Sequence, residues 1–332
     1  MSTDAAPHVV EDFAGVVQLL SDGSVVRGDD AFLMMAGTEA PPDVPAVQWK
    51  DVVYDAARGL RARLYRPPAA AAAAGDGGGK LPVLVYFHGG GYCVGAFDQR
   101  IFHSFCQRAA AALPAVVLSV QYRLAPEHRL PAAIDDGAAF LAWLGRQAVL
   151  AAGAEPWLAE SADLARTFVS GVSAGANLAH HVVVRAAAGQ VVLGAVSVAG
   201  YVLCSPFFGG VERTATEAEP PAGVNLTVPA ADQLWRMALP AGATRDHPAA
   251  NPFGPESPDL EAVALPPALV VAPGRDVLHG HALRYAARLR EMGKAVELAV
   301  FAEEEHGFSV RRWGEANVEL TRILKRFVQQ SK

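Results

Sequence analysis

Apolar and polar positions change their period repeatedly along this chain, from about residue 83 to residue 328. Short, nearly continuous apolar runs predict buried strands, and longer segments of helical character lie between them. Such alternation requires crossover connections, so we expect a mostly parallel central sheet that helices cover on both faces. The predicted strands are 83–87, 116–121, 168–171, 195–203, 268–272 and 296–301, and the predicted helices are 102–112, 132–147, 174–188, 282–292 and 318–328.

Two strands are also predicted ahead of this region, at 52–54 and 60–65. Gly59 ends the loop between them, so they should pair antiparallel at an edge of the sheet. The alanine-rich and glycine-rich stretch 67–80 that follows predicts a surface loop.

The N-terminal segment has an apolar face at helical spacing, which predicts a short helix over 13–20, followed by a strand over 24–27. Sealing a pocket for an apolar ligand and ordinary core packing are equally compatible with that face. Its members are Phe13, Val16, Val17 and Leu20.

A second segment, from about 207 to 265, breaks the strand–helix alternation with many prolines and one helical patch at 231–237. A long excursion inside a compact domain is usually a lid or a binding insertion. We therefore expect a single α/β domain over 1–332, with a cap over the active site made by the N-terminal segment 1–45 and this insertion.

Composition narrows the choice of partner. The chain has 332 residues, 52% of them hydrophobic, and a net charge of −6. A large core is therefore available, and a nucleic-acid or anionic-membrane partner is disfavoured. We see neither a secretory signal nor an apolar run long enough to span a bilayer, which predicts a cytoplasmic protein, with the nucleus as a further location. The three cysteines, which are widely separated, predict reduced packing residues: Cys93, Cys106 and Cys204.

Candidate chemistry starts at the sequence GVSAG, residues 171–175, between a predicted strand and a predicted helix. This pattern in this context predicts a nucleophile elbow, in which Ser173 occupies a strained strand-to-helix turn. Flanking glycines let neighbouring backbone segments approach closely. A plain turn without chemistry is the alternative, so the assignment depends on the rest of the chain.

The partners of such a serine follow in the order acid, then histidine. Asp276 and His306 each stand just past the end of a predicted strand, at the sheet edge where ligands bind in open α/β folds. A turn or cap role is the alternative for Asp276. Two other histidines, His180 and His181, lie too far down the helix from Ser173 and are interpreted as packing and surface residues.

The glycine run at 88–91, HGGG, directly follows a predicted strand. A loop without side chains can bring N–H groups against a developing oxyanion. We expect an oxyanion hole formed by the N–H groups of Gly89, Gly90 and Ala174.

These residues together predict ester hydrolysis through a serine acyl-enzyme, with no metal and no cofactor, acting on a small-molecule ester. A homodimer is left open. The candidate substrate-binding residues are Phe13, Val17, Tyr92, Phe207, Trp235 and Phe308.

From about residue 11 to 327 the chain resembles the hormone-sensitive-lipase group of α/β-hydrolases, and more closely the plant carboxylesterases, a family that includes the gibberellin receptor. The matching motifs are HGGG at 88–91, YRLAPEH at 122–128, the serine elbow and HGF at 306–308. Two positions depart from the family pattern: Val172 stands where an aspartate is usual, and Arg275 where a small residue is common.

Segments 14–23, 209–214 and 239–247 look like the carboxylesterase-15 subgroup, which is similar to esterases that inactivate strigolactones. The resemblance thus implies hormone catabolism. A general xenobiotic or acetyl carboxylesterase and a hormone receptor of the gibberellin-receptor type are the alternatives. His306 favours catalysis, because the gibberellin receptors have lost this base.

Overall fold

The structure is a computed structural model that describes residues 6–30, 44, 46–68, 79–150, 153–311 and 313–330. Residues 1–5, 31–43 and 45 of the predicted N-terminal cap, and 69–78 of the predicted surface loop, lie outside the described residues.

One eight-stranded sheet organises the molecule, in the order β11-β10-β9-β8-β6-β7-β5-β4. The strands from β11 to β7 run parallel to one another, whereas β5 pairs antiparallel with both β7 and β4. The predicted mostly parallel sheet with an antiparallel edge is therefore confirmed. The strand bounds are β4 Gln48–Asp55, β5 Leu60–Arg66, β6 Leu81–Phe87, β7 Val116–Val120, β8 Ala162–Val172, β9 Val198–Cys204, β10 Ala268–Arg275 and β11 Val296–Glu305.

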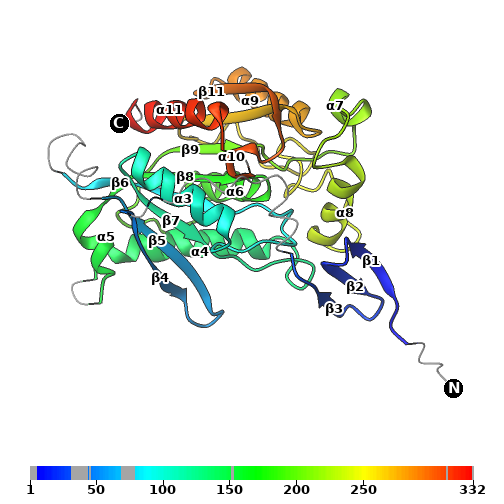
Figure 1. The fold of residues 1–332 in the computed structure, drawn as a ribbon, viewed down its shortest axis with the longest axis horizontal. Helices are drawn as coiled ribbons and strands as arrows, with labels where there is room; N and C mark the ends of the chain where they lie inside the picture. Colours follow the sequence, from blue (N-terminus) through cyan, green and yellow to red (C-terminus); the bar gives the residue numbers. More distant parts are fainter. Residues whose placement is uncertain are drawn as a thin grey trace.

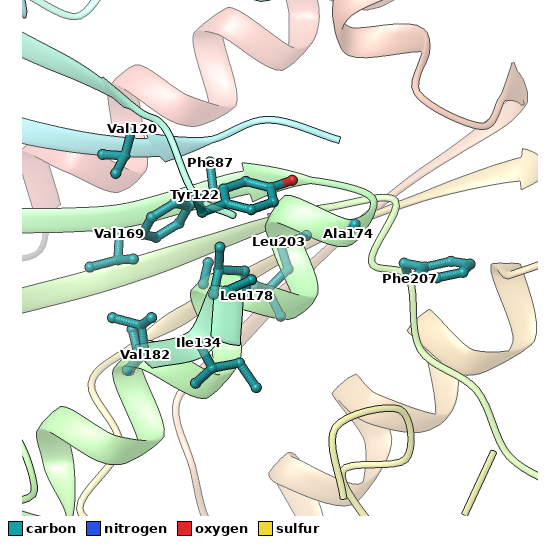
Figure 2. Close-up of a cluster of buried hydrophobic side chains, with 14 of the residues drawn as sticks. Phe87, Val120, Tyr122, Ile134, Val169, Ala174, Leu178, Val182, Leu203 and Phe207 are labelled. Atoms are coloured by element: carbon teal, nitrogen blue, oxygen red, sulfur yellow. The ribbon is translucent and has the colours of Figure 1, made fainter. Parts of the chain in front are cut away.

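Helices cover both faces of this sheet (Figure 1). Alternate strand residues supply the two faces: Val85 and Phe87 belong to one hydrophobic cluster, and Tyr86 between them to the other. The first cluster holds α4 (Ala132–Gln147), α6 (Ala174–Ala187) and α9 (His279–Glu291), and the second holds α3 (Arg100–Ala112), α10 (Phe308–Arg311) and α11 (Glu315–Gln330). In Figure 2, Leu178 and Val182 of α6 lie beside Phe87 and Val169 of the sheet. A short helix, α5 (Pro156–Ser161), precedes β8.

The N-terminal segment does not form the predicted helix over 13–20. It forms a three-stranded antiparallel sheet from β1 (Val9–Phe13), β2 (Val17–Leu20) and β3 (Val25–Arg27). Ala14 and Gly15 both have positive φ, +52° and +69°, and make the tight turn that pairs Phe13 with Val17. The strand predicted at 24–27 is confirmed.

The insertion carries two helices, α7 (Ala215–Ala218) and α8 (Val228–Ala238). Figure 1 shows the small N-terminal sheet beside α8. Gln233 of α8 donates to the backbone oxygen of Asp12 at 2.9 Å, and Arg236 pairs with Glu11 at 2.6 Å. Segments more than two hundred residues apart in sequence are thereby joined.

No helix within the described residues is long and apolar enough to cross a bilayer. The three cysteines are free and buried, as predicted. Burial raises the pKa of Cys93 and of Cys204 to about 12, so both stay protonated thiols near neutral pH.

Candidate active site

Ser173 stands in a strained turn between β8 and α6, with φ +57° and ψ −119°. Gly171 and Gly175, which flank it in the pattern, are required because a side chain at either position would collide with backbone atoms. A Cβ on Gly171 would lie 2.2 Å from the backbone of Gly175, and a Cβ on Gly175 would lie 2.0 Å from the backbone oxygen of Phe87. Backbone atoms cannot move aside as a side chain can, so the turn accepts only glycine at both positions. This is the geometry that the GVSAG pattern predicts.

The three residues predicted to act together are joined by hydrogen bonds. His306 Nε2 lies 2.8 Å from Ser173 Oγ, and His306 Nδ1 lies 2.8 Å from Asp276 Oδ2. Because an ionised carboxylate only accepts, Nδ1 carries the proton and Nε2 is left to accept from the serine hydroxyl. Asp276 is 1% exposed, and its Oδ1 accepts from the N–H of Leu278 at 2.9 Å.

The glycine loop lies against the elbow. A Cβ on Gly89 would lie 3.1 Å from the backbone oxygen of Val172, so the two segments are in close contact. Gly89 and Gly90 both line the cavity in front of Ser173. Ala174 is the first residue of α6, and the first N–H groups of a helix lack an intrahelical acceptor. The three predicted oxyanion donors thus belong to segments that meet at Ser173.

His88 supports this loop from behind. Burial lowers the pKa of its imidazole to about 4, so the ring is neutral near neutral pH. Its Nδ1 lies 2.7 Å from the carbonyl oxygen of Gly89, and the ring stacks on Tyr122 at 4.3 Å between centroids. The Tyr122 hydroxyl donates to the backbone oxygen of His88 at 2.8 Å. His88 therefore fixes the path of the loop.

Gly90→Ala is expected to lower kcat for a nitrophenyl ester by about 10²- to 10³-fold, the loss typical of one oxyanion donor. Gly90 has φ +119°, and a Cβ there would lie 2.0 Å from the backbone oxygen of Val94, so the loop must move. Gly59→Ala is the matched control, because φ is +68° there and nothing lies within 4 Å. Steady-state kinetics measure kcat for both variants. Equal losses of kcat in Gly90→Ala and Gly59→Ala would show an effect of backbone strain alone, without a role for the glycine loop in catalysis.

A cavity of about 400 Å³ opens in front of Ser173 and His306. The insertion supplies Asn225, Leu226 and Leu234 to its wall, and the N-terminal sheet supplies Phe13. The other lining residues come from the glycine loop, α3, the end of β8 and the segment after β11; they are Gly89, Gly90, Gly91, Val94, Ile101, Phe102, Val172, Gly307, Val310 and Arg311.

Of the six predicted substrate-binding residues, only Phe13 lies on this wall. Trp235 and Phe207 stack on each other at 4.2 Å, and the Tyr92 hydroxyl donates to Asn177 Oδ1 at 2.5 Å. Val17 and Phe308 are buried in the two cores. The structure therefore does not place Val17, Tyr92, Phe207, Trp235 or Phe308 at the cavity, because their side chains fill the protein interior.

The two departures from the family pattern have clear positions. Val172 is 2% exposed and forms part of the cavity wall next to the serine. Arg275 pairs with Glu305 at 3.6 Å and donates to the backbone oxygen of Ala222 in the insertion at 3.1 Å. Nearby, Asn225 donates to the backbone oxygen of His306 at 2.9 Å. The insertion is thus held against the loop that carries His306.

The histidines on α6 lie apart from this chemistry. His180 is buried and its Nδ1 lies 2.8 Å from the Tyr285 hydroxyl, while burial lowers its pKa well below the usual value. His181 Nε2 lies 3.1 Å from the backbone oxygen of Ala249. Both take part in packing.

A family model described as an α/β-hydrolase fold matches residues 84–310. The chain belongs to this family, and the predicted α/β-hydrolase fold is confirmed. Relatives of known name include the gibberellin receptor GID1C of Arabidopsis thaliana, 37% identical over 78% of this chain and 74% of the receptor. Carboxylesterase 20 of the same plant is 38% identical over 73% of this chain and 72% of that protein. The 3-O-acetylpapaveroxine carboxylesterase CXE2 of Papaver somniferum is 36% identical over 78% and 83%.

Solved structures of similar fold include esterases. An esterase of Pyrobaculum calidifontis has a TM-score of 0.70 and 28% identity, over 85% of each chain. The carboxylesterase EstE1, cloned from a metagenomic library, has a TM-score of 0.71 and 27% identity, over 91% of this chain and 93% of that one. The protein is accordingly an α/β hydrolase of the carboxylesterase type, with both carboxylesterases and gibberellin receptors among its relatives.

Proposed function

We propose that this protein hydrolyses carboxylic esters through a covalent acyl-serine, and that strigolactones are its substrates. The observation that carries the esterase part of the proposal is the set of hydrogen bonds from Ser173 through His306 to Asp276, of which Ser173 and His306 line the cavity. The strigolactone part rests on the resemblance of segments 14–23, 209–214 and 239–247 to the carboxylesterase-15 subgroup. A serine hydroxyl is a weak nucleophile at neutral pH unless an adjacent base accepts its proton.

Each step of the reaction uses a group on this wall. Ser173 Oγ attacks the ester carbonyl carbon while His306 Nε2 accepts its proton. The N–H groups of Gly89, Gly90 and Ala174 stabilise the oxyanion, and His306 then donates the proton to the departing alkoxide. Water, deprotonated by His306, releases the acyl group from Ser173.

Substrate identity is tested by incubating the purified protein with a strigolactone and measuring the fragments by mass spectrometry. Release of the butenolide-ring fragment above the level of a Ser173→Ala control is the expected result. Cleavage of a nitrophenyl ester without cleavage of the strigolactone would leave a general or acetyl carboxylesterase instead.

A hormone receptor is the second candidate, favoured by the 37% identity to the gibberellin receptor GID1C. In that role the cavity would hold a hormone without turning it over. The hydrogen bond between His306 Nε2 and Ser173 Oγ argues for the esterase, because a binding pocket has no need of a base placed on its serine. Hormone binding by a protein that hydrolyses no ester would favour the receptor.

Phe13→Ala is expected to raise KM for bulky apolar esters several-fold more than KM for nitrophenyl acetate. Phe13 lines the cavity from the edge of the small sheet, and a short acyl group need not reach it. Val10→Ala, on the same strand but 49% exposed, is the matched control. Truncation before residue 24 is less informative, because Val16 and Val17 are core residues and their loss would destabilise the fold. Equal effects of Phe13→Ala on both esters would contradict a role in substrate size.

A further inference from the structure

The turn that carries His306 is held by contacts from other segments. It has two residues, His306 and Gly307, between the end of β11 and the start of α10. Gly307 has φ +70°, a conformation that glycine adopts without strain, and its N–H donates to Ser205 Oγ at 3.3 Å. Small displacements of a catalytic group lower the rate strongly, so the contacts that fix this turn affect turnover.

One of these contacts comes from the insertion. Asn225 Nδ2 donates to the backbone oxygen of His306 at 2.9 Å. Asn225 and the next residue, Leu226, also line the cavity. A hydrogen bond to a carbonyl oxygen is directional, so it restricts the orientation of that peptide unit and of the imidazole attached to it. A single short segment therefore contacts both the substrate space and the backbone of the base.

Arg275 joins the same segment to the two strands that carry the acid and the base. It directly precedes Asp276, and its partner Glu305 directly precedes His306. Arg275 and Glu305 are register partners where β10 and β11 end, and their side chains form an ion pair at 3.6 Å. Arg275 Nη2 donates to the backbone oxygen of Ala222 in the insertion at 3.1 Å. Because both charged side chains are partly exposed, the ion pair contributes little to stability, and its main effect is on geometry.

We propose that Asn225 and Arg275 are positioning residues, which hold His306 in the geometry that catalysis needs. They act through residues 222–226 of the insertion, called the insertion clamp below. This inference rests on the proposed esterase function and makes the insertion part of the catalytic unit, besides its place in the cavity wall. Without either side chain, the imidazole spends less time in the productive position. The value of kcat then falls, while binding of a short ester is unchanged.

Asn225→Ala is expected to lower kcat for nitrophenyl acetate about twofold to tenfold, the range for one neutral hydrogen bond. KM should stay nearly constant, because a short acyl group need not reach the insertion. Gln233→Ala is the matched control. It also removes a side-chain amide of the insertion that donates to a backbone oxygen, that of Asp12 at 2.9 Å, but Gln233 does not line the cavity. Its kcat should equal that of the wild-type protein.

Arg275→Ala tests whether both side chains act through the insertion clamp. Alone it is expected to lower kcat about twofold to tenfold as well. Arg326→Ala, which removes an ion pair to Glu297 on the same strand β11, should leave kcat unchanged. In the double variant of Asn225→Ala and Arg275→Ala, the loss should be smaller than the product of the two single losses, because either change already releases the clamp. A loss equal to that product would show two independent effects and overturn the shared role.

Unchanged kcat in Asn225→Ala, or a change in KM alone, would overturn the inference. If the wild-type protein hydrolyses no ester, the proposed function fails, and proton NMR then tests the positioning by itself. The exchange rate of the His306 Nδ1 proton with water reports how often its bond to Asp276 opens. Faster exchange in Asn225→Ala but not in Gln233→Ala supports the clamp, and equal exchange in the two variants refutes it.

Discussion

Replacing Ser173 by alanine is expected to lower kcat for a short-chain nitrophenyl ester by roughly a thousandfold or more. Ser173 Oγ is the atom that His306 Nε2 contacts at 2.8 Å, and no acyl-enzyme forms without it. Loss of a nucleophile in comparable serine hydrolases removes nearly all catalysis that depends on the triad. Absorbance of released nitrophenolate, corrected for spontaneous hydrolysis, measures the effect.

Ser170→Ala is the control for this experiment, because Ser170 lies on the same strand, β8, and is also buried. Its hydroxyl donates to the backbone oxygen of Val85 at 2.9 Å, so its loss should cost some stability but leave the cavity intact. Normal turnover by Ser173→Ala would remove this residue as the nucleophile.

Asp276→Asn is expected to lower kcat by about 10⁴-fold, the effect of the same change in serine proteases, with little change in structure. One carboxylate oxygen of Asp276 accepts from Leu278 N–H and the other from His306 Nδ1. An asparagine whose oxygen keeps the bond to Leu278 presents its NH₂ group to Nδ1. The imidazole must then carry its proton on Nε2, where it cannot accept from Ser173. Single-turnover kinetics with a nitrophenyl ester report this step directly.

Asp246→Asn serves as the control, since Asp246 also accepts from a backbone N–H, that of Val211 at 3.0 Å, but does not line the cavity. We expect this variant to retain its turnover. If Asp276→Asn also kept most of its rate, His306 would need no orienting carboxylate, and the proposed mechanism would have to be abandoned.

The positions of Ser173, Asp276 and His306 could be predicted because each follows a strand whose apolar pattern is clear. Parallel strands bring their carboxyl ends to one edge of the sheet, so residues far apart in sequence meet there. The prediction of a helix over 13–20 was wrong for a local reason. Phe13 and Val17 have the spacing of one helix face, but they also pair across a hairpin once Ala14 and Gly15 adopt positive φ.

The residues of the cavity wall were harder to predict than the three hydrogen-bonded residues Ser173, His306 and Asp276. Trp235 and Phe207 are large aromatic residues in the insertion, yet their mutual stacking buries both. Ile101 and Arg311 line the cavity because α3 and α10 pack beside the elbow, and no local pattern encodes that packing. The spacing of apolar residues predicts which face of a helix or strand is buried. Whether a side chain on that face lies in the core or on the cavity wall depends on neighbours from elsewhere in the chain.

The separation between Ser173 and His306 has a consequence for the newly made protein. The two residues are 133 positions apart in sequence, and the segment between them includes β10, which positions Asp276. During synthesis the serine leaves the ribosome long before the histidine is added. If Ser173 is the nucleophile, as proposed, we therefore expect its hydroxyl to stay unactivated in the nascent chain until β11 has joined the sheet edge and brought His306 to it.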